Sequence, residues 1–325
     1  MREGGAASSR SRVHVGVVME AFLDRPLSEV GRWLASSLPA VTDVEVGTGG
    51  YAPHPHCDTG LLLRDAAARS SWLDEVGSFG LSVGALNVWG NPLHPDPEVA
   101  RGHDAALRDT IRLAAALGVD RVVAMSGCPA GAPGDRTPHF AGGGWLPYLE
   151  GITELQWQDV VEPYWSEVAE FARREHPDLL ICLELHPGTV TYNVETFERL
   201  ARLGESIAAN LDPSHFFWMQ MDALAVAERL GPKVGHCHGK DVQFNADRLA
   251  LNGLLDRRWP RPPEEMPWNF SVVGRGKDSG WWSRLVAVLL AKSRIHTIAI
   301  EHEDPFVDAE EGVVEAAAVL ARALV

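Results

Sequence analysis

The stretch LLICLEL (residues 179–185) is an apolar run that carries one carboxylate, Glu184, close to its end. Short runs of this kind are typical of strands buried on both faces of a parallel sheet. The segment that follows, residues 195–203, has the apolar spacing of a helix. A strand followed by a helix is the repeating unit of parallel α/β folds, because the helix carries the chain back to the start of the next strand.

The same unit recurs on both sides of residues 179–203. The predicted strands lie at 13–18, 41–46, 81–88, 120–126, 179–185, 206–212, 233–239 and 296–302. The predicted helices lie at 27–37, 59–78, 98–117, 158–175, 195–203, 222–230, 280–292 and 309–323. Eight units with none left over predict an α/β fold of the (β/α)8 TIM-barrel class, in one domain over residues 13–325. A doubly wound open sheet would carry a glycine-rich turn after its first strand, but MEAFLDRP (19–26) holds no glycine.

Composition agrees with a globular protein and disfavours two classes of partner. Of the 325 residues, 46% are hydrophobic and 22% are charged, which is ordinary for a packed domain. The chain has 29 basic and 44 acidic residues, for a formal charge of −15. Nucleic acids and anionic membranes attract basic surfaces, so we expect neither as a partner. No apolar run reaches membrane-spanning length.

The N-terminus and the cysteines indicate a cytoplasmic protein. Residues 1–12, MREGGAASSRSR, are small and polar with no apolar segment after them, so we expect a disordered tail and not a signal peptide. The four cysteines show no C-x-x-C spacing. So few thiols in so long a chain favour a reducing compartment over a disulfide framework.

Two predicted connections are far longer than the rest. One runs from Gly127 to about Gln156 after the fourth strand, and the other from Lys240 to about Ser279 after the seventh. Both follow strands, so both would lie at the C-terminal face of the barrel, where active sites of this fold are built. We therefore expect these long loops to act as lids or substrate walls.

Carboxylates and histidines gather at the ends of four consecutive predicted strands. They are Glu184 and His186, Asp212, His236 and His238, and Glu301 and His302. Each carboxylate alone could cap the helix that follows it, but four strands ending this way favour a shared site at the barrel mouth. Two Glu, one Asp and one His form a mixed oxygen and nitrogen site that suits manganese or magnesium, with cobalt and zinc as alternatives.

These strand ends belong to longer segments that resemble a known family. The segments are CLELHPGTVTYNVETFERL (182–200), NLDPSHFFWMQMD (210–222), VGHCHGKD (234–241) and IEHEDP (300–305). They resemble the sugar phosphate isomerase/epimerase family of xylose isomerase-like TIM barrels. Upstream, VEVGTGGYAPHPHCD (44–58), ALNVWGNPLHPDPE (85–98) and VVAMSGCP (122–129) resemble a carbohydrate-active branch of it, similar to the one with the catalytic subunits of C-glycoside deglycosidases, which are 3-keto-glycoside lyases. The resemblance covers nearly the whole chain beyond the tail.

The resemblance implies a ligand set and a reaction type. The family's metal ligands fall on Glu184, Asp212, His238 and Glu301, and its substrate-contacting histidine, in the motif D-x-x-H, falls on His215. The implied cofactor is a divalent ion, with Mn²⁺ preferred and Mg²⁺, Co²⁺ or Zn²⁺ as alternatives. The implied reaction removes a proton beside a carbonyl to form an enediolate.

Several residues become candidates for catalysis on this basis. Glu184 and Glu301 would be both ligands and acid/base groups, and His186 and His215 would join them as catalytic residues. Lys240 is a third candidate general acid. The predicted substrate-binding residues are His215, Lys240, Glu45, His56, Trp89, His94 and Arg275. Each also has a plain structural alternative, such as packing or surface pairing.

Two further features concern the substrate. The chain has eleven tryptophans, and those in or near the predicted mouth loops are Trp145, Trp218, Trp259 and Trp268. Aromatic faces stack on sugars and on aryl groups, so these residues suit a free sugar or a glycoside. Ketose 3-epimerases of this superfamily carry an Arg six residues beyond the ligand histidine, and this chain has Phe244 there. The grip on the substrate must therefore differ.

Two reactions remain open on the same scaffold. The leading interpretation is an isomerase or epimerase of a keto sugar or cyclitol, and the alternative is a lyase of a 3-keto-glycoside or an inosose dehydratase-like β-elimination. A nuclease of the AP endonuclease type is disfavoured by the charge of −15. A non-catalytic binding protein is disfavoured by the complete ligand set. We expect a small-molecule carbohydrate substrate, a homo-oligomer and, in the lyase branch, a small accessory subunit.

Overall fold

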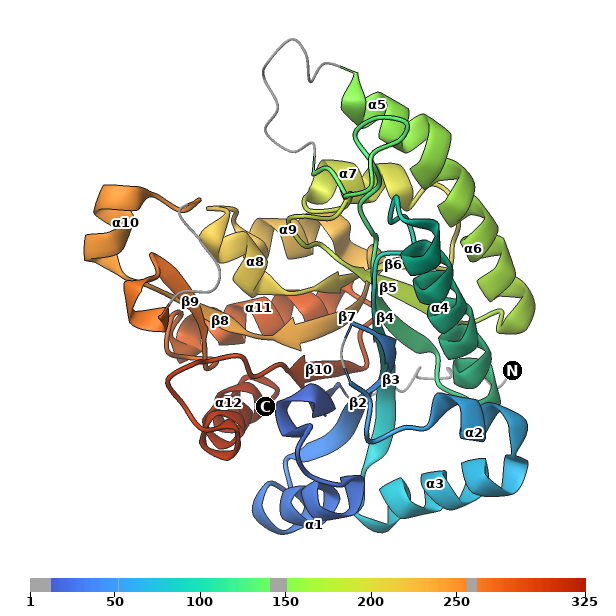
Figure 1. Cartoon of the computed structure of the whole chain (residues 1–325). Helices are drawn as coiled ribbons and strands as arrows, with labels where there is room; N and C mark the ends of the chain where they lie inside the picture. Colours follow the sequence, from blue (N-terminus) through green and yellow to red (C-terminus); the bar gives the residue numbers. More distant parts are fainter. Residues whose placement is uncertain (1–12, 52, 141–150, 256–261) are drawn as a thin grey trace, which may run out of the picture.

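A closed barrel of parallel strands forms the centre of the molecule (Figure 1). The structure, a computed structural model, describes residues 13–51, 53–140, 151–255 and 262–325. The strands of the barrel are β1 (His14–Val18), β2 (Val41–Gly50), β3 (Ser82–Trp89), β4 (Arg121–Met125), β5 (Leu180–Glu184), β6 (Ile207–Leu211), β7 (Val234–Gly239) and β10 (Thr297–Ile300). Their order around the barrel is β1-β10-β7-β6-β5-β4-β3-β2. The TIM-barrel prediction is confirmed, and each predicted strand overlaps one observed strand.

Helices cover the outside of the barrel, as Figure 1 shows. They include α1 (Leu27–Ser37), α4 (Pro97–Leu117), α6 (Glu162–Glu175), α7 (Val194–Leu200), α9 (Ala223–Leu230), α11 (Ser279–Lys292) and α12 (Ala309–Ala323). The single helix predicted over 59–78 is wrong: the segment forms α2 (Thr59–Arg64) and α3 (Ala66–Ser78). The break falls at Asp65, whose backbone is extended and whose carboxylate accepts hydrogen bonds from the amides of Ala67 and Ala68. A side chain that caps a new helix in this way ends the previous one.

The two long connections contain structure of their own. The first includes α5 (Ile152–Gln156) and a π-helical turn, η3 (Trp157–Val161). After β6, a short helix α8 (Pro213–Trp218) precedes α9. The second long connection holds the antiparallel pair β8 (Asp241–Phe244) and β9 (Trp268–Ser271), with α10 (Ala246–Asn252) between them. The predicted tail 1–12, Trp145 and Trp259 lie outside the described residues.

Asp241 anchors the return of the second long connection to the barrel. One of its carboxylate oxygens accepts hydrogen bonds from the backbone amides of Gly274, Gly276 and Lys277, and from Trp282 Nε1. Gly276 must be a glycine here, because a Cβ would lie 2.1 Å from the carbonyl oxygen of Val242. The loop is therefore tied to the strand end and not merely appended to it.

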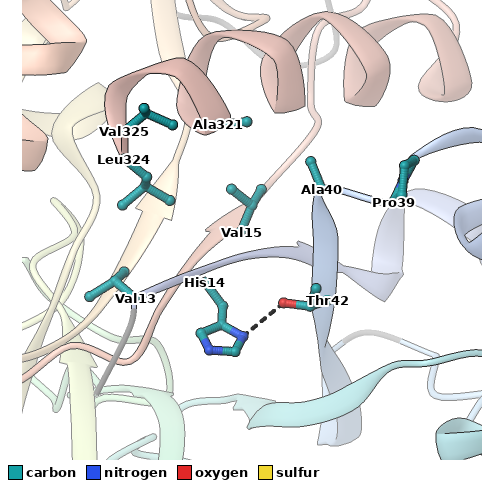
Figure 2. Close-up of a pocket in the computed structure, with 9 residues that line it drawn as sticks. All are labelled: Val13, His14, Val15, Pro39, Ala40, Thr42, Ala321, Leu324 and Val325. Carbon is teal, nitrogen blue, oxygen red and sulfur yellow. Dashed lines mark hydrogen bonds between the residues drawn. The ribbon is translucent and has the colours of Figure 1, made fainter. Parts of the chain in front are cut away.

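A pocket lies at the N-terminal end of the barrel, opposite the carboxyl ends of the strands. Figure 2 shows it between the starts of β1 and β2 and the end of α12, lined mainly by small and aliphatic residues. His14 contacts Thr42 there, with Nδ1 2.8 Å from Oγ1. One histidine and no carboxylate line this pocket. It therefore lacks the groups that the predicted chemistry needs. Within the described part of the chain, no helix combines the length and hydropathy needed to cross a membrane.

Candidate active site and metal centre

Four buried side chains converge at the C-terminal end of the barrel. Glu184 is the last residue of β5, Asp212 and Glu301 follow β6 and β10 directly, and His238 lies in β7. One ligand atom from each of the four lies within 4.8 Å of the others. We call these four residues the ligand cluster. The structure therefore brings together the four residues that the sequence singled out as metal ligands, on adjacent strands β5, β6, β7 and β10.

The ligand cluster has lone pairs that its neighbours leave unused. Asp212 Oδ2 and Glu301 Oε2 are buried, and neither accepts a hydrogen bond from a described residue. His238 Nδ1 lies 3.0 Å from Glu301 Oε2 and 3.4 Å from Glu184 Oε2. Buried carboxylate oxygens without donors are costly unless a cation neutralises them. Three carboxylates and one imidazole in this arrangement fit a divalent metal ion.

A carboxylate outside the ligand cluster, that of Glu45, contacts the other nitrogen of the His238 ring. Glu45, in β2, lies 3.2 Å from His238 Nε2 through either oxygen and 2.7 Å from His236 Nε2. Asn87 donates a hydrogen bond to Glu45 over 2.6 Å. Burial would raise the pKa of Glu45, but the two histidines hold it well below its usual range. Glu45 was predicted to bind substrate; the structure instead places it behind His238, where it orients the ring and leaves Nδ1 for the ligand cluster.

Two histidines beside the ligand cluster differ in charge. His215, in α8, donates a hydrogen bond from Nε2 to Glu184 Oε1 over 2.9 Å, and it lies 3.3 Å from Asp212 Oδ2. Burial alone would lower the pKa of His215, but Asp212 and Glu184 raise it to about 9. The ring of His186 lies 4.2 Å from that of His215, edge to face. Burial and the charge of His215 lower the pKa of His186 to about 4. At neutral pH the pair therefore offers a proton donor and a proton acceptor.

Lys240 directly follows β7, and its side chain reaches the ligand cluster. Its ammonium lies 2.7 Å from Glu301 Oε2 and 3.0 Å from Asp212 Oδ2, without the alignment of a hydrogen bond, and it donates to Glu303 over 2.8 Å. It also lies 4.4 Å from the ring centre of Phe270. Burial would lower the pKa of Lys240, but the carboxylates raise it well above its usual value. Lys240 could instead have paired with its neighbour Asp241 at the surface, but it is buried, and the Asp241 carboxylate accepts hydrogen bonds from backbone amides.

The remaining predicted substrate residues have partners or positions of their own. His56 Nε2 lies 2.9 Å from the carbonyl oxygen of Arg25, and His94 Nδ1 accepts from the amide of Asp96. Arg275 makes a bidentate pair with Glu315 on α12. Trp89 ends β3, and its Nε1 is buried without a hydrogen-bond partner among the described residues. Contact with substrate remains a prediction for these four.

Aromatic residues of the second long connection reach the site. Trp268 stacks on Trp218 with ring centres 4.9 Å apart and planes 10° apart. Phe270 contacts Trp268 at 5.4 Å and His215 at 5.6 Å, both edge to face. The β8–β9 pair therefore brings an aromatic wall against α8. This agrees with the prediction that the loop after the seventh strand is a wall of the mouth.

Sequence reasoning missed two acidic residues of the site, Glu20 and Glu303. Glu303 lies in the segment IEHEDP, and it shares Lys240 with Glu301. Glu20 follows β1 within the turn η1 (Met19–Phe22). Burial, together with the charges of Glu45 and Glu301, raises the pKa of Glu20 to about 8. The signal was present, because the first strand also runs into a carboxylate, in MEAFLDRP (19–26).

Comparison with known sequences gives a family and two relatives. The sequence profile of the xylose isomerase-like TIM barrels matches residues 54–323. The uncharacterized protein YfiH of Bacillus subtilis (strain 168) is 35% identical over 276 residues, which cover 84% of this chain and 88% of YfiH. An inosose dehydratase of Yersinia enterocolitica is 30% identical over 101 residues, which cover 30% of this chain and 32% of the dehydratase.

Comparison with solved structures shows the same fold at low identity. A probable 3-DHS dehydratase from Bacillus anthracis has a TM-score of 0.64 at 12% identity, over 95% of this chain and 98% of its own. An L-ribulose 3-epimerase has a TM-score of 0.60 at 16% identity, and the match covers 96% of this chain and 94% of the epimerase. The IOLI protein, solved with a bound zinc atom, has a TM-score of 0.61 at 14% identity, and the match covers 96% of this chain and 98% of IOLI. These likenesses establish the fold and leave the reaction to the site residues.

Proposed function

The chain belongs to the xylose isomerase-like TIM barrel family, and we propose that it is a metal-dependent carbohydrate enzyme that removes a proton beside a carbonyl. One observation carries this proposal: the ligand cluster is complete and buried, and two of its carboxylate oxygens accept no hydrogen bond from a described residue. The leading reaction is the isomerisation or epimerisation of a keto sugar or cyclitol. The L-ribulose 3-epimerase that shares the fold supports this choice of reaction class.

We propose that Glu184, Asp212, His238 and Glu301 hold a divalent ion, Mn²⁺ before Mg²⁺, Co²⁺ or Zn²⁺. Oxygen-rich sites with one imidazole suit these ions, and the IOLI protein of the same fold binds zinc. An ion in this site would act as a Lewis acid on the substrate carbonyl. Asp212 serves only to hold it, whereas Glu184 and Glu301 also face the substrate as proton acceptors.

The protein's own groups divide the proton transfers between them. Glu301 lies in surroundings that raise its pKa, chiefly through burial, whereas the hydrogen bond from His215 helps hold the pKa of Glu184 well below its usual range against burial. Glu184 and Glu301 face each other across the ligand cluster, so one can remove the proton beside the carbonyl and the other can return a proton to the opposite face. His215, charged at neutral pH, holds Glu184 in place and donates a hydrogen bond or proton from the other side of the ligand cluster.

A lyase is the second candidate function. Phe244 stands where ketose 3-epimerases hold their substrate with Arg, and it lies in β8 opposite Trp268. The mouth is also rich in proton donors, His215 and Lys240 among them, and β-elimination needs one to protonate the leaving oxygen. The inosose dehydratase and the 3-DHS dehydratase among the similar proteins support this alternative.

One experiment separates the two reactions. The purified, Mn²⁺-loaded protein is incubated in D2O with a panel of keto sugars, inososes and 3-keto-glycosides, and the products are followed by NMR and mass spectrometry. Deuterium at the carbon beside the carbonyl without bond cleavage identifies an isomerase or epimerase. Release of water or of an aglycone identifies a lyase. The absence of exchange with every member of the panel would reject the proposed function.

Location and partners form part of the proposal. All four cysteines are free and buried, which supports a reducing cytoplasm. We propose a small-molecule carbohydrate or glycoside as substrate and a homo-oligomer as the assembled form. A small accessory subunit is proposed only for the lyase alternative. Size-exclusion chromatography with light scattering measures the assembly directly.

A further inference from the structure

Glu20 approaches the ligand cluster from a side that none of the assigned residues occupies. It follows β1, which lies between β10 and β2 in the barrel. The strand β5, which carries Glu184, is directly across the barrel from β1, because three strands separate the two in either direction. Val18 is in register with Glu45 on β2, and Val17 with Ile300 on β10. Glu20 therefore stands just above the level of Glu45 and Glu301 on the face opposite Glu184.

The chain makes room for the Glu20 carboxyl. A Cβ built on Gly47 in β2 would lie 2.5 Å from Glu20 Oε1, so any larger residue at this position would displace the carboxyl group. Gly47 has an ordinary backbone conformation and is not among the residues with positive φ. Its lack of a side chain is therefore a matter of space.

The carboxyl of Glu20 also has a buried oxygen without a partner. Oε2 is buried and accepts no hydrogen bond from the residues that the structure describes. The charged groups around it are Glu45 on β2, Glu301 after β10 and His238 on β7, and no described lysine or arginine pairs with it. Two of these three neighbours are acids. In the metal-free protein a carboxylate in this position would be poorly solvated and repelled, so the neutral acid is the favoured form there.

We propose that Glu20 is a further catalytic residue, a neutral carboxylic acid that donates a hydrogen bond to a substrate oxygen which becomes negative during the reaction. The inference rests on the proposed function, because the substrate oxygen belongs to a polyhydroxy carbonyl compound bound at the ligand cluster. The free Oε2 gives the carboxyl a place for a hydrogen-bonded partner that the protein itself does not supply. A donor fixed in advance at such a position stabilises developing negative charge without reorganisation.

The step is balanced in both candidate reactions. In an isomerisation the base takes the proton beside the carbonyl, the electron pair of that C–H bond forms the enediolate, and Glu20 keeps its proton while it donates to an enediolate oxygen. In an elimination the base takes the proton beside the carbonyl, and the electron pair of that C–H bond forms a carbon–carbon double bond. The carbon–oxygen bond at the β carbon breaks, its electron pair stays on the departing oxygen, and Glu20 passes its proton to that oxygen. The carboxylate left behind then recovers a proton from water. The base releases its own proton to water.

Four variants test the proposal with the Mn²⁺-loaded protein and the substrate that the panel identifies. Glu20→Ala removes the donor, Glu20→Gln keeps a neutral donor that cannot give up a proton, and Gly47→Ala displaces the carboxyl. Glu228→Gln is the matched control, an exposed glutamate on α9. We expect kcat/KM to fall about 10²-fold in Glu20→Ala and Gly47→Ala. Metal content should stay at the wild-type level. In Glu20→Gln, kcat/KM should fall by as much if the reaction is an elimination, because glutamine cannot give up a proton. It should fall far less if the reaction is an isomerisation, because glutamine still donates a hydrogen bond.

A spectroscopic measurement tests the neutral acid without any substrate. Infrared difference spectra of the EDTA-treated wild-type protein should show the carbonyl band of a protonated carboxylic acid at neutral pH, lost as the pH rises through about 8. The band should persist in Glu228→Gln and vanish in Glu20→Gln. A wild-type protein without the band, or Glu20→Ala with full turnover, would overturn the inference.

The deuterium experiment distinguishes failure of this inference from failure of the proposed function. If the wild-type protein exchanges no deuterium with any substrate of the panel, the proposed function fails and the catalytic role of Glu20 fails with it. If the wild-type protein exchanges deuterium and Glu20→Ala keeps full turnover, the proposed function stands and only the role of Glu20 is rejected.

Discussion

His215 Nε2 donates a hydrogen bond to Glu184 Oε1 over 2.9 Å, and both side chains are almost fully buried. The pair joins the first turn after β6 to the end of β5. It also lies beside Asp212, 3.3 Å from the same nitrogen. A buried imidazolium between two carboxylates links the charge state of the site to its stability, which leads to the first prediction.

Stability of the metal-free protein should depend on pH through His215. The carboxylates of Asp212 and Glu184 raise the pKa of His215 in the folded protein from its ordinary 6.5 to about 9, against burial. The contribution of His215 to stability is therefore full below about pH 6.5 and disappears as the pH rises through about 9. The contribution is on the order of 3 kcal/mol. Urea unfolding in EDTA at several pH values should show this loss between pH 6.5 and 9 for the wild-type protein. His215→Gln should lose this pH dependence, and an unchanged slope would contradict the prediction.

Removing a cluster ligand should abolish both metal retention and turnover. Glu184→Gln, Asp212→Asn and Glu301→Gln each replace a carboxylate that faces the other ligands within 4.8 Å. Plasma mass spectrometry of the purified variants should find little metal, and Mn²⁺ should no longer raise Tm. In the wild-type protein, Mn²⁺ at a hundred times its Kd should add about 2.7 kcal/mol of stability over the EDTA-treated form. Full activity in a metal-free preparation would reject the metal mechanism.

Glu45→Gln should weaken metal binding without touching a ligand. Glu45 fixes the His238 ring through Nε2, so its loss should lower metal affinity about 10- to 100-fold. Calorimetric titration with Mn²⁺ measures the change, with Glu228→Gln as the control. If Glu45 contacted only the substrate, affinity for Mn²⁺ would be unchanged and KM alone would rise.

Lys240→Met should affect the metal-free protein more than the loaded one. The ammonium lies close to Asp212, Glu301 and Glu303, and without it their charges face one another in a buried site. Removing one partner of a buried ion pair costs about 3–5 kcal/mol. The metal-free variant should therefore unfold at a much lower temperature, and added Mn²⁺ should recover part of the loss. Equal losses in both forms would show that Lys240 does not share its carboxylates with the metal.

Arg275→Gln should have a small effect. Its guanidinium is partly exposed and pairs with Glu315 on α12, and exposed pairs contribute about 0–1 kcal/mol. Tm and turnover should both remain near wild-type values. A large rise in KM with unchanged Tm would instead support the substrate contact that its place in the seventh loop predicted.

Much of the fold and the ligand cluster could be predicted because both depend on local signals. Buried parallel strands read as apolar runs, so LLICLEL and its counterparts located the barrel strands to within a few residues. The break at Asp65 was missed because the apolar pattern continues across it, while the capping hydrogen bonds that end one helix there appear only in three dimensions. The β8–β9 pair was missed because its strands are 23 residues apart and are recognised by their pairing.

The class of the fold and the four members of the ligand cluster follow from the sequence alone, because a barrel brings the carboxyl ends of consecutive strands to one face whatever the length of the loops between them. The groups that surround these four residues depend on how distant segments pack in three dimensions. Glu45 lies in β2 and Glu20 follows the neighbouring strand β1, yet two histidines hold the Glu45 carboxyl in its anionic form, whereas burial raises the pKa of Glu20. Charge states of this kind depend on distances of a few ångströms between residues far apart in the chain, and no local pattern encodes them.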